Sequence, residues 1–422
     1  MNVIASYAPT GAARDAAPRW RRWLRRHTLP ARAAVLAAAG ALFLAPLAVP
    51  AAPAVAALAP GVRSAARPAL TDQLLAVSCP ARRRCIAVGI ANFDHQAMLA
   101  ERWTGRRWSV MHLAQPAGAT GGGLTGVSCT SARACTAVGF DFNPATGSGP
   151  VAERWNGRRW HIQATPTVGS GGVPFAGVSC ASRTSCTAVG YYDFGSLGFT
   201  SRTLVEHWDG SGWAVQTTPQ IGDPGSDLTS VSCPSQSTCT AAGYSIEQSD
   251  EGPDTAPLAM RWHAATWAIQ PTPADAGGNV FSGLNGVSCP AATACIAVGS
   301  TVDDSPLALR WNGTKWHSQA VRGELTEPGL NGVSCSSAHA CTAVGGEFSS
   351  GFAERWNGRR WALQHIRHPG GARGISLTAV SCSSARRCTA VGSYSTSGGI
   401  VTLAERWNGR RWVVQPTRSP AP

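Results

Sequence analysis

The chain repeats one pattern seven times, and this repetition constrains its fold more strongly than any other feature. The last copy shows the pattern: Leu377-Thr-Ala-Val-Ser-Cys382, then Cys388-Thr-Ala-Val-Gly392, then Leu403-Ala-Glu-Arg-Trp407, and then Trp412-Val-Val-Gln415. The first Cys of successive copies lies 46 to 56 residues after the one before. A regular period of this length indicates a repeat architecture, in which each copy packs only against its neighbours.

Each copy contains four short segments rich in β-forming residues, which clusters of Gly, Asn, Pro and Ser separate. No stretch of the repeats has sustained helical periodicity between capping residues. Four strands per repeat are typical of a propeller blade. We therefore predict an all-β, seven-bladed β-propeller with four antiparallel strands per blade over residues 74–417, a linker at 60–73 and a tail at 418–422. The first and last copies are both complete, so no spare strand indicates how the first and last blades join to close the ring.

Each copy also contains two Cys separated by five residues, and together these pairs use all 14 Cys. The pair spans the turn between the first two strands. Facing residues of an antiparallel pair have Cα atoms about 4.5–5.5 Å apart, which a disulfide accepts. A metal site would need Cys or His converging on one ion, and no His recurs with the pairs. We predict no metal and one disulfide per blade: Cys79–Cys85, Cys129–Cys135, Cys180–Cys186, Cys233–Cys239, Cys289–Cys295, Cys335–Cys341 and Cys382–Cys388.

A pair of Trp five positions apart ends each copy, and in several copies an Asn-Gly turn separates the two rings. If Asn408-Gly409 is the whole loop, Trp407 pairs with Arg410 and the two Trp meet diagonally. If the loop has four residues, Trp407 faces Trp412 directly. In both cases we expect the rings to pack in the core, and aromatic platforms for sugars are the alternative.

The N-terminal segment has the features of an export signal. Residues 1–32 contain seven Arg, and an apolar stretch rich in Ala follows up to about residue 59. Together with small-residue sites such as Ala54-Val55-Ala56, these features predict a secretory signal peptide over 1–59, with an uncleaved membrane anchor as the alternative. Without it the chain has 29 basic and 22 acidic residues, so its net charge is about +7 instead of +13. We expect a secreted or cell-surface protein.

The order of the motifs resembles that of known propeller families. The frame Leu-x-x-Val-Ser-Cys, Cys-Thr-Ala-Val-Gly and a Gly-containing turn before Trp-x-x-Gln resembles the photosystem II stability/assembly factor group and, more distantly, the Asp-box repeats of bacterial neuraminidases. The Asp box itself, Ser/Thr-x-Asp-x-Gly-x-Thr-Trp, is not matched by Trp407-Asn408-Gly409-Arg410-Arg411-Trp412, and only Asp209 comes near it. The resemblance therefore implies the fold and carries over no catalytic residue, because a fold used this widely does not define a function.

Turns in a four-stranded meander alternate between two faces, so the Cys and Trp turns share one face. Loops on the other face vary in length, as binding loops do. They contain aromatic and acidic residues side by side, which suits sugar or peptide recognition, and ordinary solvated loops are the alternative. The ligand-binding candidates are Phe93, Asp94, Phe140, Asp141, Tyr191, Tyr192, Asp193, Phe194, Tyr244, Asp303, Asp304, Glu347, Phe348 and Tyr394.

The face with the Cys and Trp turns is basic. Two Arg precede the second Trp in four copies, as Arg410 and Arg411 do in the last copy. Such a ring of charge could hold an anionic cell-wall polymer or phospholipid headgroups. Solubilising turns with Arg packed on Trp are the alternative. Nucleic acid is not an expected partner outside the cell.

Catalytic signatures are absent from the sequence, which has no Gly-x-Ser-x-Gly, His-Glu-x-x-His, P-loop or dinucleotide motif. We expect an exported, monomeric, non-enzymatic propeller without a cofactor, which binds or scaffolds a glycan or protein at the cell surface. Its membrane contact would be limited to an uncleaved N-terminal segment. A propeller hydrolase or lyase acting on polysaccharide is the alternative, and one blade with carboxylates out of pattern would favour it. The resemblance alone suggests a third role, as an assembly factor for a membrane complex.

Overall fold

The structure is a computed structural model, and it describes residues 70–92, 96–169, 174–193, 200–222, 224–249, 252–273, 282–301, 305–321, 329–346 and 351–418. All seven repeats belong to one compact unit. The predicted signal peptide at 1–59 lies outside the described residues.

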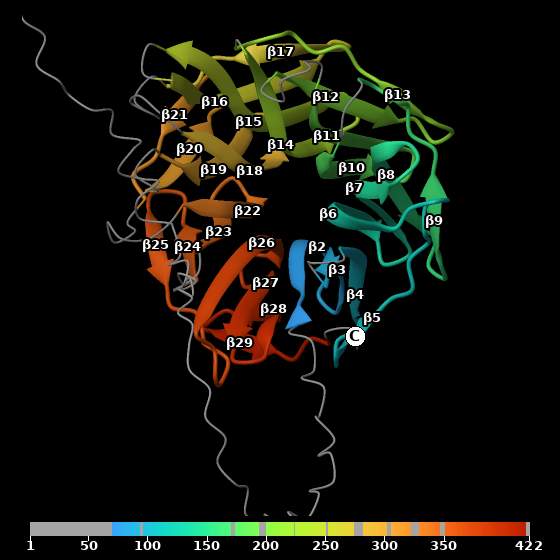
Figure 1. Cartoon of the computed structure of the whole chain (residues 1–422). Coiled ribbons are helices and arrows are strands. Elements are labelled where there is room, and N and C mark those ends of the chain that lie inside the picture. Colours follow the sequence, from blue (N-terminus) through green and yellow to red (C-terminus); the bar gives the residue numbers. More distant parts are fainter. Residues whose placement is uncertain are drawn as a thin grey trace, which may run out of the picture. The chain divides into compact units, whose positions relative to one another are not determined.

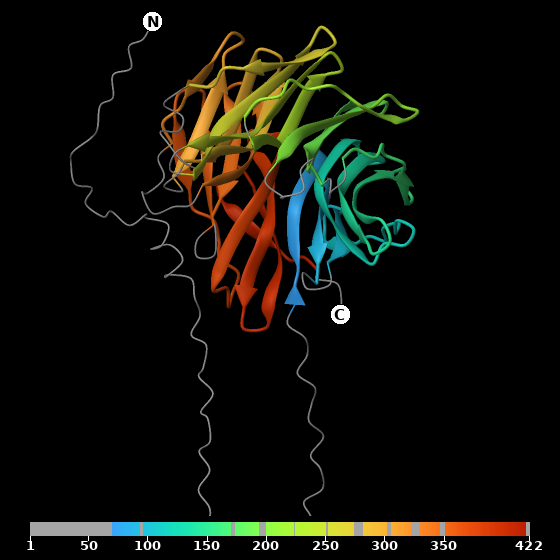
Figure 2. The ribbon, with the colours of Figure 1, turned by 45° about the horizontal axis from the view of Figure 1, so that its top comes forward.

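Seven antiparallel sheets surround a common axis as the blades of a propeller (Figure 1), and Figure 2 shows the same blades from a tilted direction. This arrangement confirms the predicted all-β, seven-bladed fold, and no helix occurs in the described ranges. Blades 1 to 7 consist of β2–β5, β6–β9, β10–β13, β14–β17, β18–β21, β22–β25 and β26–β29. The strands are β1 (Leu70–Thr71), β2 (Gln73–Ala81), β3 (Arg84–Ala91), β4 (Ala97–Trp103), β5 (Trp108–Val110), β6 (Gly121–Ser131), β7 (Ala134–Asn143), β8 (Gly147–Trp155), β9 (Trp160–Gln163), β10 (Phe175–Ser182), β11 (Ser185–Asp193), β12 (Ser201–Trp208), β13 (Trp213–Val215), β14 (Pro224–Ser235), β15 (Thr238–Ser249), β16 (Gly252–His263), β17 (Thr266–Gln270), β18 (Gly283–Ala291), β19 (Ala294–Ser300), β20 (Pro306–Trp311), β21 (Trp316–Ser318), β22 (Leu330–Ser337), β23 (Ala340–Gly345), β24 (Phe352–Trp356), β25 (Trp361–Gln364), β26 (Gly374–Ser384), β27 (Arg387–Thr396), β28 (Gly399–Trp407) and β29 (Trp412–Gln415).

Contacts between blades 7 and 1 close the ring, and β2 lies beside β26 in Figure 1. The short strand β1, Leu70–Thr71, pairs in parallel with β28 and makes the sheet of blade 7 five-stranded. The Asp72 backbone N–H donates to the Ile400 carbonyl at 3.0 Å. The Thr378 hydroxyl donates to the Leu74 carbonyl at 2.6 Å. Closure therefore uses the segment directly before β2, which the repeat pattern did not reveal.

The Cys turn and the Trp turn of a blade lie at the same end of its sheet. In blade 3, Cys186 pairs with Trp208 across β11 and β12, and Trp208 pairs with Trp213 across β12 and β13. We call this end of the seven sheets the hairpin face and the opposite end the loop face. This division is the one that the alternating turns predict.

All seven predicted disulfides are present, and no Cys is free. Their Cα atoms are 3.9 to 4.1 Å apart, which is shorter than the predicted range. Cys180 faces Cys186 directly, and a register shift follows immediately. The pair therefore belongs to an irregular, narrow part of the ladder.

The Trp turn has the longer of the two loops that the sequence allowed, because Trp407 pairs directly with Trp412. Asn408 orders the turn, since its Oδ1 accepts the backbone N–H groups of Arg410 and Arg411 at 2.9 and 3.0 Å. The two indole rings are in contact, with centroids 5.8 Å apart. Both rings are buried, which supports their predicted place in the core.

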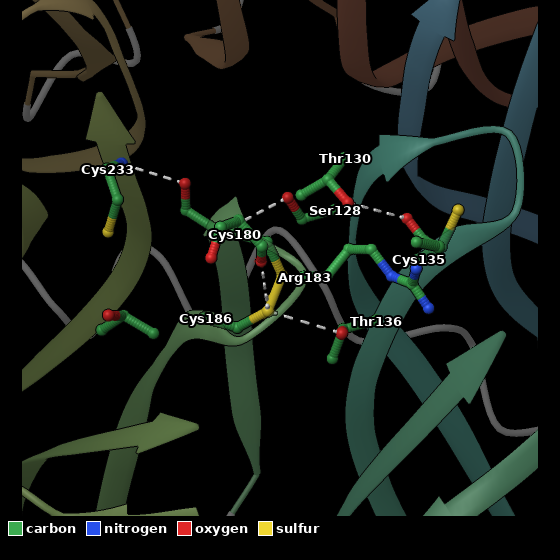
Figure 3. Close-up of a disulfide and its surroundings, with 12 residues drawn as sticks. Ser128, Thr130, Cys135, Thr136, Cys180, Arg183, Cys186 and Cys233 are labelled. Atoms are coloured by element: carbon green, nitrogen blue, oxygen red, sulfur yellow. Dashed lines mark hydrogen bonds between the residues drawn. A yellow bond between two sulfur atoms is a disulfide. The ribbon is translucent and has the colours of Figure 1, made fainter. Parts of the chain in front are cut away.

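The Ser of each Val-Ser-Cys segment links its blade to the next, a role that the repeat pattern did not reveal. Figure 3 shows the Ser128 hydroxyl accepting the backbone N–H of Cys180, and Thr136 beside Cys186. A disulfide sulfur has no hydrogen, so the Thr136 hydroxyl donates in that contact. This hydrogen bond between the Ser hydroxyl and the Cys N–H is 2.9 to 3.0 Å long at all seven seams: Ser78–Cys129, Ser128–Cys180, Ser179–Cys233, Ser232–Cys289, Ser288–Cys335, Ser334–Cys382 and Ser381–Cys79.

Apolar packing at the seams joins neighbouring blades into the core. Trp155 and Trp160 of blade 2, for example, pack with Ile86, Val88 and Met98 of blade 1. The Arg before the first Trp of a blade stacks on the first Trp of the next blade. These pairs are Arg102–Trp155, Arg154–Trp208, Arg261–Trp311 and Arg355–Trp407, with distances of 5.0 to 5.9 Å to the ring centroid.

Five blades bury a glutamate two positions before the first Trp. The buried side chains are Glu101, Glu153, Glu206, Glu354 and Glu405. Burial raises the pKa of Glu206 to about 8 and those of the other four to about 7. Three of them accept a backbone N–H from the linker that leaves the preceding blade: Glu153 from Ala114, Glu405 from Arg367 and Glu101 from Arg418. These interior carboxyl groups therefore hold the linkers on the seams.

Candidate ligand-binding site

Half of the predicted ligand-binding residues can be placed. Those outside the described residues are Phe93, Asp94, Phe194, Asp303, Asp304, Glu347 and Phe348. The others lie near the loop-face ends of the second strands of blades 2, 3, 4 and 7: Phe140, Asp141, Tyr191, Tyr192, Asp193, Tyr244 and Tyr394.

Several of these side chains make local structural contacts. Tyr192 packs in the cluster of buried residues around Phe175, and Tyr394 packs in the cluster around Ile375. Asp141 Oδ1 accepts the backbone N–H of Gly149 at 2.9 Å. Packing and turn formation explain the positions of these three residues.

Tyr191 and Asp193 in β11 of blade 3 lie across a seam from Asp227 in β14 and Tyr244 in β15 of blade 4. Alternation along β11 directs Tyr191 and Asp193 to one side, away from Tyr192. Asp227 pairs directly with Tyr244, whose hydroxyl donates a hydrogen bond of 2.6 Å to Asp227 Oδ2. The charges of Asp227 and Asp193 both act on Tyr191. We call these four residues the seam 3–4 cluster.

Burial governs the titration of the cluster. It raises the pKa of Asp227, an effect that hydrogen bonds from the Ser201 and Tyr244 side chains oppose and the charge of Asp193 increases. Burial, followed by the hydrogen bond to Asp227, raises the pKa of Tyr244. Burial, followed by the charges of Asp227 and Asp193, raises the pKa of Tyr191. Both phenols therefore stay protonated at neutral pH and can donate hydrogen bonds.

Asp227 Oδ1 and Ser201 Oγ are both buried at this seam, and the Ser201 side chain hydrogen-bonds to the Asp227 carboxyl group. Ser201 begins β12, and its backbone approaches Gly225 so closely that a Cβ there would overlap it. Buried polar atoms in folded proteins are normally hydrogen-bonded. Ser201 and Tyr244 therefore hold the Asp227 carboxyl group in place beside the Tyr191 ring.

Asp227 is the functional candidate that the sequence analysis missed. It lies directly before the core Leu228 of the first strand, where the other copies have Gln73, Gly123, Pro174, Gly283, Gly329 and Ser376. Only blade 4 has a carboxylate there. Aligning the seven copies at this position would therefore have identified Asp227 as a candidate. Asp227 lies inside a strand, whereas the acidic candidates were all predicted to lie in loops.

The cluster combines acceptors, donors and aromatic rings without the parts of a metal centre. No group of three or more His, Cys, Asp or Glu in the described ranges could hold a metal ion. No helix in those ranges is long and apolar enough to cross a membrane. What the cluster can do chemically is to form hydrogen bonds and to pack ring faces against a ligand.

No known family model matches the sequence, and no curated protein matches it. A GH74 xyloglucanase from Xanthomonas campestris has a similar structure, with a TM-score of 0.53 and 12% identity over 83% of this chain and 55% of that one. YCF48 bound to D1 peptide matches with a TM-score of 0.48 and 11% identity, over 81% and 93% of the two chains. A six-bladed fucose-recognising lectin from Aleuria aurantia matches with a TM-score of 0.44 and 10% identity, over 83% and 97%. The first similarity supports the propeller fold alone, and this chain spans about half the length of that enzyme.

Proposed function

We propose that this protein is an exported, non-enzymatic binding module, which holds a glycan or a protein segment of the cell surface at the seam 3–4 cluster. The observation that carries the proposal is the convergence of Tyr191 and Asp193 with Asp227 and Tyr244 across the seam of blades 3 and 4. Ring faces of Tyr suit the C–H faces of sugars and apolar peptide side chains. Carboxyl and hydroxyl groups suit sugar hydroxyls and peptide N–H groups.

The place of action follows from the chemistry of the fold. Seven disulfides form and persist in oxidising surroundings outside the cytosol. The Arg-rich and apolar segment at 1–59 is the signal that would bring the chain there. We infer that the protein acts in the extracellular space or at the cell surface.

Cosedimentation of the oxidised full chain with insoluble cell walls and polysaccharides, over a NaCl series, tests this function. We expect saturable binding that persists at high salt, because ring packing and uncharged hydrogen bonds are little screened. Tyr191→Ala and Asp227→Asn should each weaken binding by about tenfold or more, as expected for residues at the centre of a site. Phe140→Ala removes a ring at the equivalent position of blade 2 and serves as the matched control.

Equal losses for Phe140→Ala and Tyr191→Ala would contradict a site at this seam. Release of new reducing ends from the polysaccharide would show a hydrolase instead of a binding module. If only a protein ligand exists, capture from membranes should show the same dependence on Tyr191 and Asp227.

A further inference from the structure

Positive charge on the hairpin face is concentrated on one side of the ring. The turns of blades 6, 7, 1 and 2 each contain at least two Arg, whereas those of blades 3, 4 and 5 contain only Arg183 and Lys315 as cations, together with Asp209. Blades 6, 7, 1 and 2 are neighbours because blade 7 packs on blade 1. The Arg residues therefore form one continuous arc, which we call the arginine arc.

The arc is dense enough for its charges to act on one another across the closing seam. Burial lowers the pKa of Arg406, and three positive charges lower it further, those of Arg387, Arg82 and Arg83. Arg82 and Arg83 come from blade 1, and Arg387 and Arg406 from blade 7. Repulsion of this kind makes the arc a place where bound anions stabilise the protein.

A groove with a volume of about 560 Å³ lies within the arc, between blades 1 and 2. One wall is the outer strand β5 with the linker that follows it, including Val110 and Met111. The other wall is the Trp turn of blade 2, including Arg158 and Arg159. Arg102 also lines the groove, and none of its lining residues is Asp or Glu. The groove thus combines three guanidinium groups with an apolar wall.

Contacts with residues of blade 2 order the cations of this groove. Asn156 Oδ1 accepts the backbone N–H groups of Arg158 and Arg159 at 2.9 and 3.0 Å. Arg159 Nε donates to His161 Nε2 at 3.2 Å. The Arg102 guanidinium lies 5.9 Å from the centroid of the Trp155 ring. Cations held in this way lose less conformational freedom when they bind an anion.

We propose that the groove binds an acidic sugar unit of a polyanionic glycan, whose chain continues along the arginine arc. Guanidinium groups bind carboxylate or phosphate in a two-pronged geometry, and the apolar wall of Val110 and Met111 fits the C–H face of a sugar ring. A polymer uses the whole arc, since each further acidic unit meets the Arg of the next turn. This site lies on the other side of the propeller from the seam 3–4 cluster, so it does not depend on the function proposed there.

Calorimetric titration of the oxidised full chain with oligogalacturonate and with a glycerol-phosphate oligomer tests the site. The oligogalacturonate should bind more tightly than the glycerol-phosphate oligomer, which has charge but no sugar ring, and the fully methyl-esterified oligogalacturonate should not bind. Arg158→Gln/Arg159→Gln should weaken binding by about tenfold or more, since it removes two charge-assisted contacts in the groove. Arg359→Gln/Arg360→Gln removes the same charge from the equivalent turn of blade 6, and should weaken binding by about threefold or less.

Three results would overturn the proposal. Equal losses for the two double variants would show diffuse attraction to the arc without a site in the groove. Equal binding of the esterified oligomer would show that charge is not recognised. Binding to phosphatidylglycerol vesicles, with no binding of either acidic oligomer, would assign the arc to a membrane surface. The four substituted Arg are exposed, so the variants should fold, and equal melting temperatures check this.

Discussion

The seam that closes the ring and the seam between blades 2 and 3 share three contacts and differ in a fourth. Both have a Ser–Cys hydrogen bond, a Thr hydroxyl on a disulfide sulfur and a Trp indole bonded to a Gln side chain. At the closing seam these contacts are Ser381–Cys79, Thr389–Cys85 and Gln415–Trp108, and at the other they are Ser128–Cys180, Thr136–Cys186 and Gln163–Trp213. The fourth contact, from a backbone N–H to a buried glutamate, joins Arg418 to Glu101 at the closing seam only.

A proline accounts for the missing contact at the seam of blades 2 and 3. Arg418 lies six residues after Trp412, the second Trp of blade 7. The equivalent residue of blade 2 is Pro166, which has no N–H to donate. Neither carboxyl oxygen of Glu206 has a hydrogen-bond partner among the described residues. Burial raises its pKa furthest among the five buried glutamates.

The seams after blades 3 and 4 follow the same rule. Blades 3 and 4 also have a proline at this position, Pro219 and Pro273. The blades that follow them have Met260 and Leu309 in place of the glutamate. An apolar residue there avoids burying a carboxyl group without a donor. Glu206 is thus an exception, in the blade that supplies Tyr191 and Asp193 to the candidate site.

The largest effect we predict tests whether the two seams are equal in apolar packing. Trp108 packs on blade 7 at the closing seam, and Trp213 packs on blade 2 at the other. Trp108→Ala and Trp213→Ala should each lower the free energy of unfolding by roughly 3–5 kcal/mol, the usual cost of removing a buried Trp. Urea unfolding of the oxidised chain measures both losses, and Trp→Phe replaces Trp→Ala where a variant does not fold.

A loss for Trp213→Ala that is several kcal/mol smaller than for Trp108→Ala would break the comparison. The seam of blades 2 and 3 would then differ in packing as well as in its carboxyl group. Val110→Ala, which truncates an exposed apolar residue beside Trp108, is the control and should change stability by less than about 0.5 kcal/mol.

The seams also show which parts of the fold were predictable from the sequence. Blade number, disulfides and Trp packing follow from residues that recur in every copy. Strand β1 at Leu70–Thr71 is not part of the repeat, so no periodic signal reveals it. The roles of Ser128 and Glu206 depend on contacts between atoms of neighbouring blades. The spacing of residues within one copy does not predict such contacts. The length of the Trp turn needed the observed register of Trp407 with Trp412.

The candidate site was predictable only in part, for the same reason. An aromatic ring after the conserved Gly marks Phe140, Tyr191 and Tyr244 in three successive blades. The sequence does not say that Tyr191 of blade 3 lies near Asp227 of blade 4, because this contact crosses a seam. Asp227 lies inside a strand and not in a loop, so the aromatic and acidic composition of the loops did not identify it.

The second prediction concerns pH and isolates the contact that distinguishes the two seams. Burial raises the pKa of Glu206 from 4.5 to about 8. At pH 4 the Glu206 carboxyl group is mostly protonated in both the folded and the unfolded chain. Between pH 6 and 8 it is ionised in the unfolded chain but stays largely protonated in the folded one. Glu206 therefore lowers stability as pH rises through this window. Glu206→Gln should raise the free energy of unfolding by roughly 2 kcal/mol at pH 8 and leave it nearly unchanged at pH 4.

Urea unfolding at pH 4, 6 and 8 measures this difference. Glu101→Gln is the matched control, because Glu101 has the N–H of Arg418 as a donor and a pKa of about 7. Its stabilising effect at pH 8 should be smaller than that of Glu206→Gln. Pro166→Ala should act on Glu206 alone, since it restores a donor and lowers the pKa of that carboxyl group. Equal pH profiles for the two Glu variants would contradict the role given to Pro166.

The smallest predicted effect tests whether the closing seam is otherwise an ordinary one. Ser381 accepts the N–H of Cys79 at 3.0 Å, and Ser128 accepts that of Cys180 at 2.9 Å. Ser381→Ala and Ser128→Ala should each cost about 1 kcal/mol, the net value of one such hydrogen bond. A clearly larger loss for Ser381→Ala in urea unfolding would mean that the ring opens first between blades 7 and 1. Equal losses would mean that the Ser–Cys hydrogen bond contributes the same stability at the closing seam as at a seam between sequential blades.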